Sequence, residues 1–94
     1  MDRAEALEVL SEELGRYRKR TYDELKAFIG QGVNAYETKA ASGTVCQLEI
    51  QVYWDGKAGG DLRVIGAIDD GGWRAFVPLT DDFILTADGE FIGE

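Results

Sequence analysis

Acidic side chains beside predicted turns are the residues of this sequence with the clearest capacity for chemistry. They are Asp55, Asp61, Asp69, Asp70, Asp81, Asp82, Asp88 and Glu90. Carboxylates that a fold brings together can act as an acid/base pair or bind a divalent cation. However, Asp and Gly are also the residues that tight turns select for conformational reasons, and the D-x-[DN]-x-[DN]-G order of a calcium loop is absent. We therefore interpret these acids as turn residues and name no metal ligand among them.

Nucleophilic catalysis is the next chemistry to consider. The chain has no histidine, so neither a Ser-His-Asp triad nor a Cys-His pair can be assembled from it. Its single cysteine, Cys46, falls on the apolar side of a predicted strand, where a thiol acts as a small hydrophobic group. The glycines of residues 56–60 lack the G-x-x-x-x-G-K-[ST] order of a phosphate-binding loop. We therefore expect a non-enzymatic protein without a cofactor.

One basic cluster is present in a chain that is otherwise acidic. It consists of Arg16, Arg18, Lys19 and Arg20, with Tyr17 and Tyr22 interleaved. Such a cluster can bind a phosphate, a nucleic-acid backbone or an acidic partner, or it can be the basic last turn of a helix, which the helix dipole favours. The formal net charge of −8 argues against nucleic acid and anionic membranes as partners. We keep Arg16, Arg18 and Arg20 as candidate binding residues.

Aromatic and apolar residues on the otherwise polar face of the predicted sheet form a second candidate surface. The aromatic members are Tyr36, Tyr53 and Phe76, and the apolar members are Val45 and Ile65. An exposed patch of this kind is typical of a subunit interface or a ligand groove. The alternative is that these side chains lie singly or under the C-terminal hairpin. We take Tyr36, Tyr53 and Phe76 as candidate binding residues.

The first third of the chain predicts helix. Leu7, Leu10, Leu14 and Tyr17 are three or four residues apart, which places them on one face of a helix. The sequence Thr21-Tyr22-Asp23-Glu24 then has the form of a capping box. It predicts a second, short helix over residues 22–29, ended by Gly30 or Gly32. One long, bent helix is the alternative.

The rest of the chain predicts strands, because its apolar residues recur at every second position. We expect strands over residues 33–40, 44–54, 61–68 and 73–79, with a tight turn over 69–72 and a short strand pair around Asp88-Gly89. Residues 44–54 give the clearest pattern. Their inward-facing residues are expected to be Cys46, Leu48, Ile50, Val52 and Trp54.

This order of elements predicts a single α+β domain over residues 1–94. One bent helix or two short helices pack on a curved antiparallel meander sheet of four to five strands. The order resembles the cystatin-like plan, but residues 51–56 do not match the protease-binding Gln-x-Val-x-Gly motif of that family. The resemblance therefore implies topology and no activity. Because the sequence shows neither a secretory signal nor a membrane span, we expect a cytoplasmic location.

Three functional hypotheses are compatible with this chain. The leading one is a small, acidic, non-enzymatic protein-binding domain that forms a homodimer through its sheet, because apolar residues occur on both sheet faces. The second is an acidic inhibitor or immunity-type partner of a basic protein, because residues 32–94 contain four bases and eleven acids. The third is a small-molecule binder with a pocket between helix and sheet.

Overall fold

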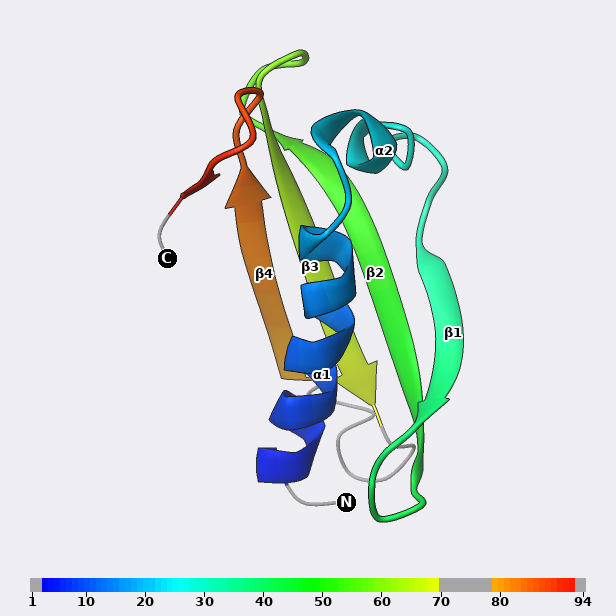
Figure 1. The fold of residues 1–94 in the computed structure, drawn as a ribbon. Coiled ribbons are helices and arrows are strands. Elements are labelled where there is room, and N and C mark those ends of the chain that lie inside the picture. Colours follow the sequence, from blue (N-terminus) through cyan, green and yellow to red (C-terminus); the bar gives the residue numbers. More distant parts are fainter. Residues whose placement is uncertain (1–2, 70–78, 93–94) are drawn as a thin grey trace.

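The computed structural model describes residues 3–69 and 79–92, and it confirms the α+β fold. Two helices precede an open, five-stranded antiparallel sheet whose strands lie in sequence order (Figure 1). The helices are α1 (Arg3–Arg18) and α2 (Tyr22–Lys26). The strands are β1 (Asn34–Lys39), β2 (Val45–Asp55), β3 (Asp61–Asp69), β4 (Leu79–Leu85) and β5 (Phe91–Ile92). Within these residues, no helix has the length and apolar character that crossing a membrane requires.

Helix α1 buries one side against the sheet, as its spacing predicts. Leu10, Leu14 and Tyr17 are buried, but Leu7 is 39% exposed, so its predicted inward position is wrong. The buried stripe also includes Ala6, Val9 and Glu13. These residues shift the centre of the stripe away from Leu7, which is left at its border.

The helical segment is two helices rather than one bent helix. The Thr21 hydroxyl accepts a hydrogen bond from the Glu24 backbone N–H at 3.1 Å, and the Glu24 carboxylate accepts one from the Thr21 N–H at 2.9 Å. This reciprocal capping box starts α2 at Tyr22. The helix ends at Lys26, three residues earlier than predicted, and tight turns follow it. The chain then passes through Gly30, whose φ of +83° suits glycine.

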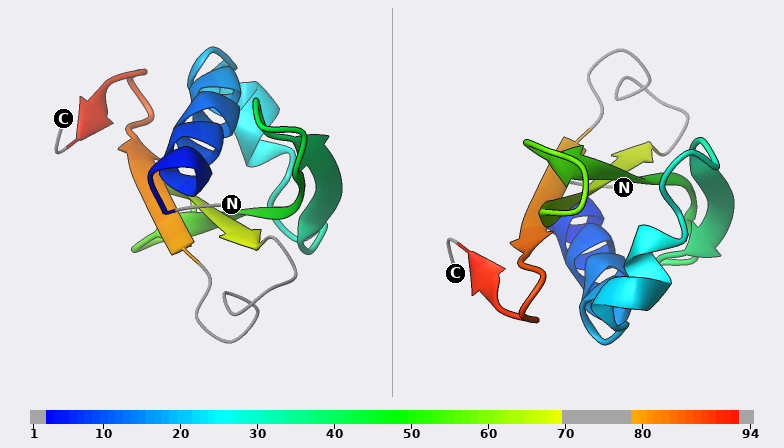
Figure 2. Two further views of the ribbon diagram at one scale, coloured as in Figure 1. Left: turned by 90° about the horizontal axis from the view of Figure 1, so that it is seen from below. Right: turned by 90° about the horizontal axis from the view of Figure 1, so that it is seen from above.

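The core lies between the helices and the inner face of the sheet (Figure 2). The predicted alternation in β2 is confirmed, since Cys46, Leu48, Ile50 and Val52 are buried and the residues between them are exposed or half-buried. Their neighbours on β3, including Leu62, Val64 and Ile68, are fully buried. We use "inner face" for this side of the sheet and "outer face" for the other.

Gly66 in the middle of β3 allows α1 to lie close to the sheet. A Cβ atom at this position would lie 2.9 Å from Leu10 Cδ1 and 3.2 Å from Leu14 Cδ2. Both leucines are buried in the core, so they have little room to move away. The glycine is therefore required by the close helix–sheet approach and not by a turn.

Strand β3 pairs with β4 in a ladder whose first residue pair joins Ile68 to Leu79. Apart from Asp69, the predicted tight turn over residues 69–72 lies outside the described residues. Apart from Leu79, the predicted strand 73–79 lies outside the described residues, as does Phe76. The predicted C-terminal hairpin is confirmed. Its turn is closed by the Gly89 N–H, which donates to the Thr86 carbonyl at 2.9 Å.

Candidate functional site

The three candidate arginines have different partners. The Arg16 Nε atom lies 3.6 Å from the Oε2 atom of Glu13 on the same helix. The Arg18 guanidinium carbon lies 5.0 Å from the ring centroid of Phe83 in β4. The Arg20 guanidinium carbon lies 5.5 Å from each of two aromatic rings at the helix junction. The cluster predicted from sequence is therefore divided among local ion-pair and cation–π contacts rather than gathered around one anion site.

Tyr36 lies on the inner face, which corrects the prediction that it shares the outer face with Tyr53. The register pairs Tyr36 with Leu48, and residues paired in an antiparallel ladder point to the same face. The Tyr36 hydroxyl donates to Oε1 of Glu13 at 2.9 Å. Burial raises the pKa of Tyr36 well above its ordinary value, and its hydrogen bonds with Tyr17 and Glu13 raise the pKa further.

Glu13, which was not predicted as a site residue, is the buried charged side chain of the described residues. Its exposed fraction is 5%. A signal was present, since Glu13 follows Leu10 by three residues and precedes Tyr17 by four, which is the spacing of the buried stripe. Its carboxylate accepts from the Tyr36 hydroxyl and faces Arg16, so its polar atoms have partners.

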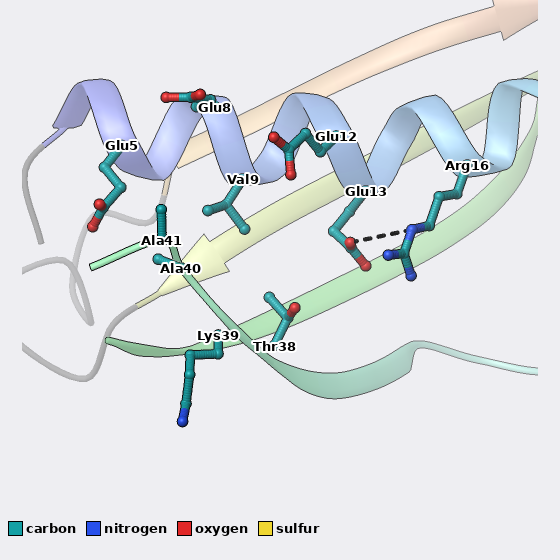
Figure 3. Close-up of a pocket in the computed structure, with 10 residues that line it drawn as sticks. All are labelled: Glu5, Glu8, Val9, Glu12, Glu13, Arg16, Thr38, Lys39, Ala40 and Ala41. Carbon is teal, nitrogen blue, oxygen red and sulfur yellow. Dashed lines mark ion pairs between the residues drawn. The ribbon is translucent and has the colours of Figure 1, made fainter. Parts of the chain in front are cut away.

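A groove runs between α1 and β1 (Figure 3). Its volume is about 170 Å³. Its charged lining consists of Glu5, Glu8, Glu12, Glu13, Arg16 and Lys39. In Figure 3 the Lys39 side chain points away from the helix. No three metal-ligating side chains come together in the part of the chain that the structure describes. The groove is smaller than the roughly 300–1,000 Å³ of ordinary small-molecule pockets, which disfavours a ligand site at this position.

The outer face carries a row of four residues across the sheet, which we call the outer strip. The ladders align Tyr53 in β2 with Arg63 in β3, Ile84 in β4 and Ile92 in β5. Tyr53 is 42% exposed and Ile92 is 46% exposed. Tyrosine, arginine and apolar side chains in one patch are the composition that protein interfaces favour.

Arg63 is held within the outer strip by two carboxylates. Its Nη2 atom lies 3.1 Å from Asp55 Oδ1, and its Nη1 atom pairs with Asp82. These hydrogen bonds, that with Asp55 foremost, raise the pKa of Arg63 above its ordinary value. The guanidinium is therefore charged and fixed in position, although the pair lies in solvent, where ion pairs contribute little stability.

Negative charge dominates the outer face around this strip. By the register of the ladders, the carboxylates on this face are Glu37, Glu49, Asp55, Asp61, Asp69 and Asp82, and its cations are Lys39 and Arg63. This count covers only the strand residues that the structure describes. Two such faces packed against each other repel, whereas a cationic surface is attracted.

Strand β1 forms one edge of the sheet and pairs only with β2 among the described strands. The Ala40 N–H donates to the Thr44 carbonyl at 2.9 Å in the adjoining hairpin, which fixes the phase of the ladder. Because the hydrogen-bonded pairs of an antiparallel ladder alternate, the backbone groups of Ala35, Glu37 and Lys39 point away from β2. This edge has no proline and no residue with a positive φ. It is therefore able to accept a further strand.

Comparison with protein-family models, with curated proteins and with solved structures finds no match for this chain.

Proposed function

We propose that this protein is a non-enzymatic protein-binding domain that associates with itself through its sheet. The observation that carries the proposal is the one-sided construction of the sheet. Both helices lie against the inner face, whereas the outer face exposes Tyr53 and Ile92, and β1 has one neighbouring strand among the described residues (Figure 2). Unpaired strand edges and exposed apolar side chains are the features through which sheets join other chains.

The chemistry of the groove does not favour catalysis. Its buried carboxylate, Glu13, is engaged by Tyr36 and Arg16 and serves the packing of α1 against β1. The sequence supplies no histidine to act as a general base or nucleophile partner. The acids of the outer face are used in part to fix Arg63.

Sedimentation velocity tests this proposal on the whole chain. The protein is measured from low micromolar to near-millimolar concentration, and the expected result is a sedimentation coefficient that rises toward that of a dimer. A single monomeric species over the whole range contradicts self-association.

A second candidate function is an acidic partner of a basic protein, and the charge of the outer face favours it. A lysine decapeptide is a suitable probe, with amide chemical shifts recorded at low and high salt. This candidate predicts salt-sensitive shifts on β2 and β3 that weaken in the double variant Glu49→Gln/Asp69→Asn. The matched control is Glu8→Gln/Glu12→Gln on α1. Equal weakening in both variants, or shifts on α1 alone, contradicts it.

A further inference from the structure

We infer that the second copy joins at the β1 edge, where two β1 strands pair antiparallel about a two-fold axis through Thr38. The two five-stranded sheets then become one continuous sheet. This inference rests on the proposed self-association and names the surface that performs it.

The backbone of β1 is in the correct phase for this pairing. In the proposed register Glu37 of one copy lies opposite Lys39 of the other, and the same pair occurs again on the far side of the axis. Both residues direct their N–H and C=O groups away from β2, so each pair can exchange two backbone hydrogen bonds. Thr38 lies on the axis, and its backbone groups face β2 in each copy.

Charge selects this register over its neighbours. Glu37 and Lys39 are both exposed on the outer face, so their side chains meet across the junction. Moving the axis to Glu37 opposes the two Glu37 carboxylates, and moving it to Lys39 opposes the two ammonium groups. A lysine on an edge strand often prevents pairing, but here Glu37 provides the opposite charge in the partner. The edge is therefore self-complementary in one register.

The surroundings favour the edge over the outer face as the place where copies meet. Helix α1 packs against β3 and β4, and Figure 1 shows β1 as the outermost strand on the side away from β4. Face-to-face packing of two outer faces brings six carboxylates of each copy together against two cations. Edge pairing leaves most of those charges in solvent. Because the junction contains few backbone bonds, the dimer is expected to be weak and dependent on concentration.

The test uses two charge-reversal variants. Each alone is expected to weaken dimer formation, and the two combined are expected to restore it. In Glu37→Lys both junction pairs become lysine against lysine, and in Lys39→Glu both become glutamate against glutamate. Each variant alone is expected to dimerise about tenfold more weakly than the wild type, because two attractive cross-strand pairs are replaced by two repulsive ones. An equimolar mixture restores opposite charges in both pairs and is expected to form a heterodimer. The double variant Glu37→Lys/Lys39→Glu is expected to form a homodimer again.

Charge-matched controls are Glu90→Lys in the turn between β4 and β5 and Lys57→Glu in the turn after β2, which change the net charge by the same amounts away from the β1 edge. They are expected to dimerise as the wild type does. If both single variants dimerise as strongly as the wild type, pairing at the β1 edge is wrong, but self-association through another surface is retained. Single variants that stay monomeric when mixed overturn the proposed register. A monomeric wild type overturns both the inference and the proposed function.

Discussion

On the inner face of the sheet, β2 and β3 place a buried residue at almost every second position, and Leu10 and Leu14 of α1 close over Gly66. On the outer face, the same strands place Tyr53 among carboxylates, together with Arg63, which is held by two ion pairs. Both faces follow from the alternation of side chains along each strand, yet among the described residues only the inner face has helices packed on it. Folding stability is therefore expected to depend mainly on the inner face, and the outer face and the β1 edge are the surfaces for which we propose binding.

The strongest test of this contrast removes a core side chain. Leu10→Ala is expected to lower the free energy of unfolding by about 2–5 kcal/mol, because it leaves a cavity where α1 meets β3. Tyr53→Ser on the outer face is expected to change it by less than about 0.5 kcal/mol. Urea unfolding of the two variants measures both values. If Leu10→Ala and Tyr53→Ser lower the free energy of unfolding by similar amounts, the two faces do not differ in their contribution to stability.

A finer test uses two adjacent residues of β3 that point to opposite faces. Gly66→Val is expected to cost about 1–3 kcal/mol, because its side chain must displace Leu10 and Leu14 from their packed positions. Ala67→Val adds a branched side chain on the outer face and is expected to be close to neutral. Urea unfolding, with circular dichroism of the folded states, compares the pair. A Gly66→Val protein as stable as Ala67→Val would contradict the close helix–sheet approach.

Tyr36→Phe tests the polar contact that joins β1 to the inner face. It removes the hydrogen bond to the buried Glu13, and the expected loss is about 1–2 kcal/mol near neutral pH. Tyr53→Phe removes a hydroxyl from the outer face and serves as the control, with little change expected. If the two substitutions lower the free energy of unfolding equally, the hydrogen bond between Tyr36 and Glu13 does not contribute to stability.

The same residue predicts a dependence on pH. Because the folded pKa of Tyr36 lies above its ordinary value near 10, the folded state keeps this proton where the unfolded chain loses it. This contribution to stability is complete below about pH 10 and declines as the pH rises above it. Urea unfolding at about pH 8 and about pH 11 is expected to show a steeper decline in the wild type than in Tyr36→Phe. Parallel declines would contradict the raised pKa.

The smallest effect is expected at Arg63. Arg63→Gln breaks the contacts with Asp55 and Asp82, but these groups are solvated, so the free energy of unfolding is expected to change little. Unfolding at low and high salt gives the measurement. A loss as large as that of Leu10→Ala would show that contacts on the outer face contribute as much to the free energy of unfolding as the core does, which contradicts the difference between the two faces.

Local patterns were sufficient to predict most of the elements. The strict alternation of β2 correctly predicted that Cys46, Leu48 and Ile50 lie on the inner face. The capping box at Thr21 correctly predicted where α2 begins. Both signals depend on residues within a few positions of one another. The α+β meander then follows from the order of the elements.

Features set by distant contacts could not be predicted in the same way. The face on which Tyr36 lies depends on its register with Leu48, and a shift of one residue reverses the face of every side chain. The pairing of β3 with β4 depends on the long-range match of Ile68 with Leu79, which a local turn signal does not specify. Glu13 was missed because a carboxylate is ordinarily exposed, and its burial depends on a hydroxyl from β1.

Hydrogen exchange at the β1 edge distinguishes a strand that pairs with a second copy from one that stays exposed to solvent. The amides of Glu37 and Lys39 point away from β2, whereas those of Tyr36 and Thr38 face it. If the edge pairs with a second copy, the exchange of Glu37 and Lys39 slows as the protein concentration rises, while Tyr36 and Thr38 exchange at a constant rate. Exchange at Glu37 and Lys39 that is fast and independent of concentration, in samples that sediment as dimers, would contradict pairing through this edge.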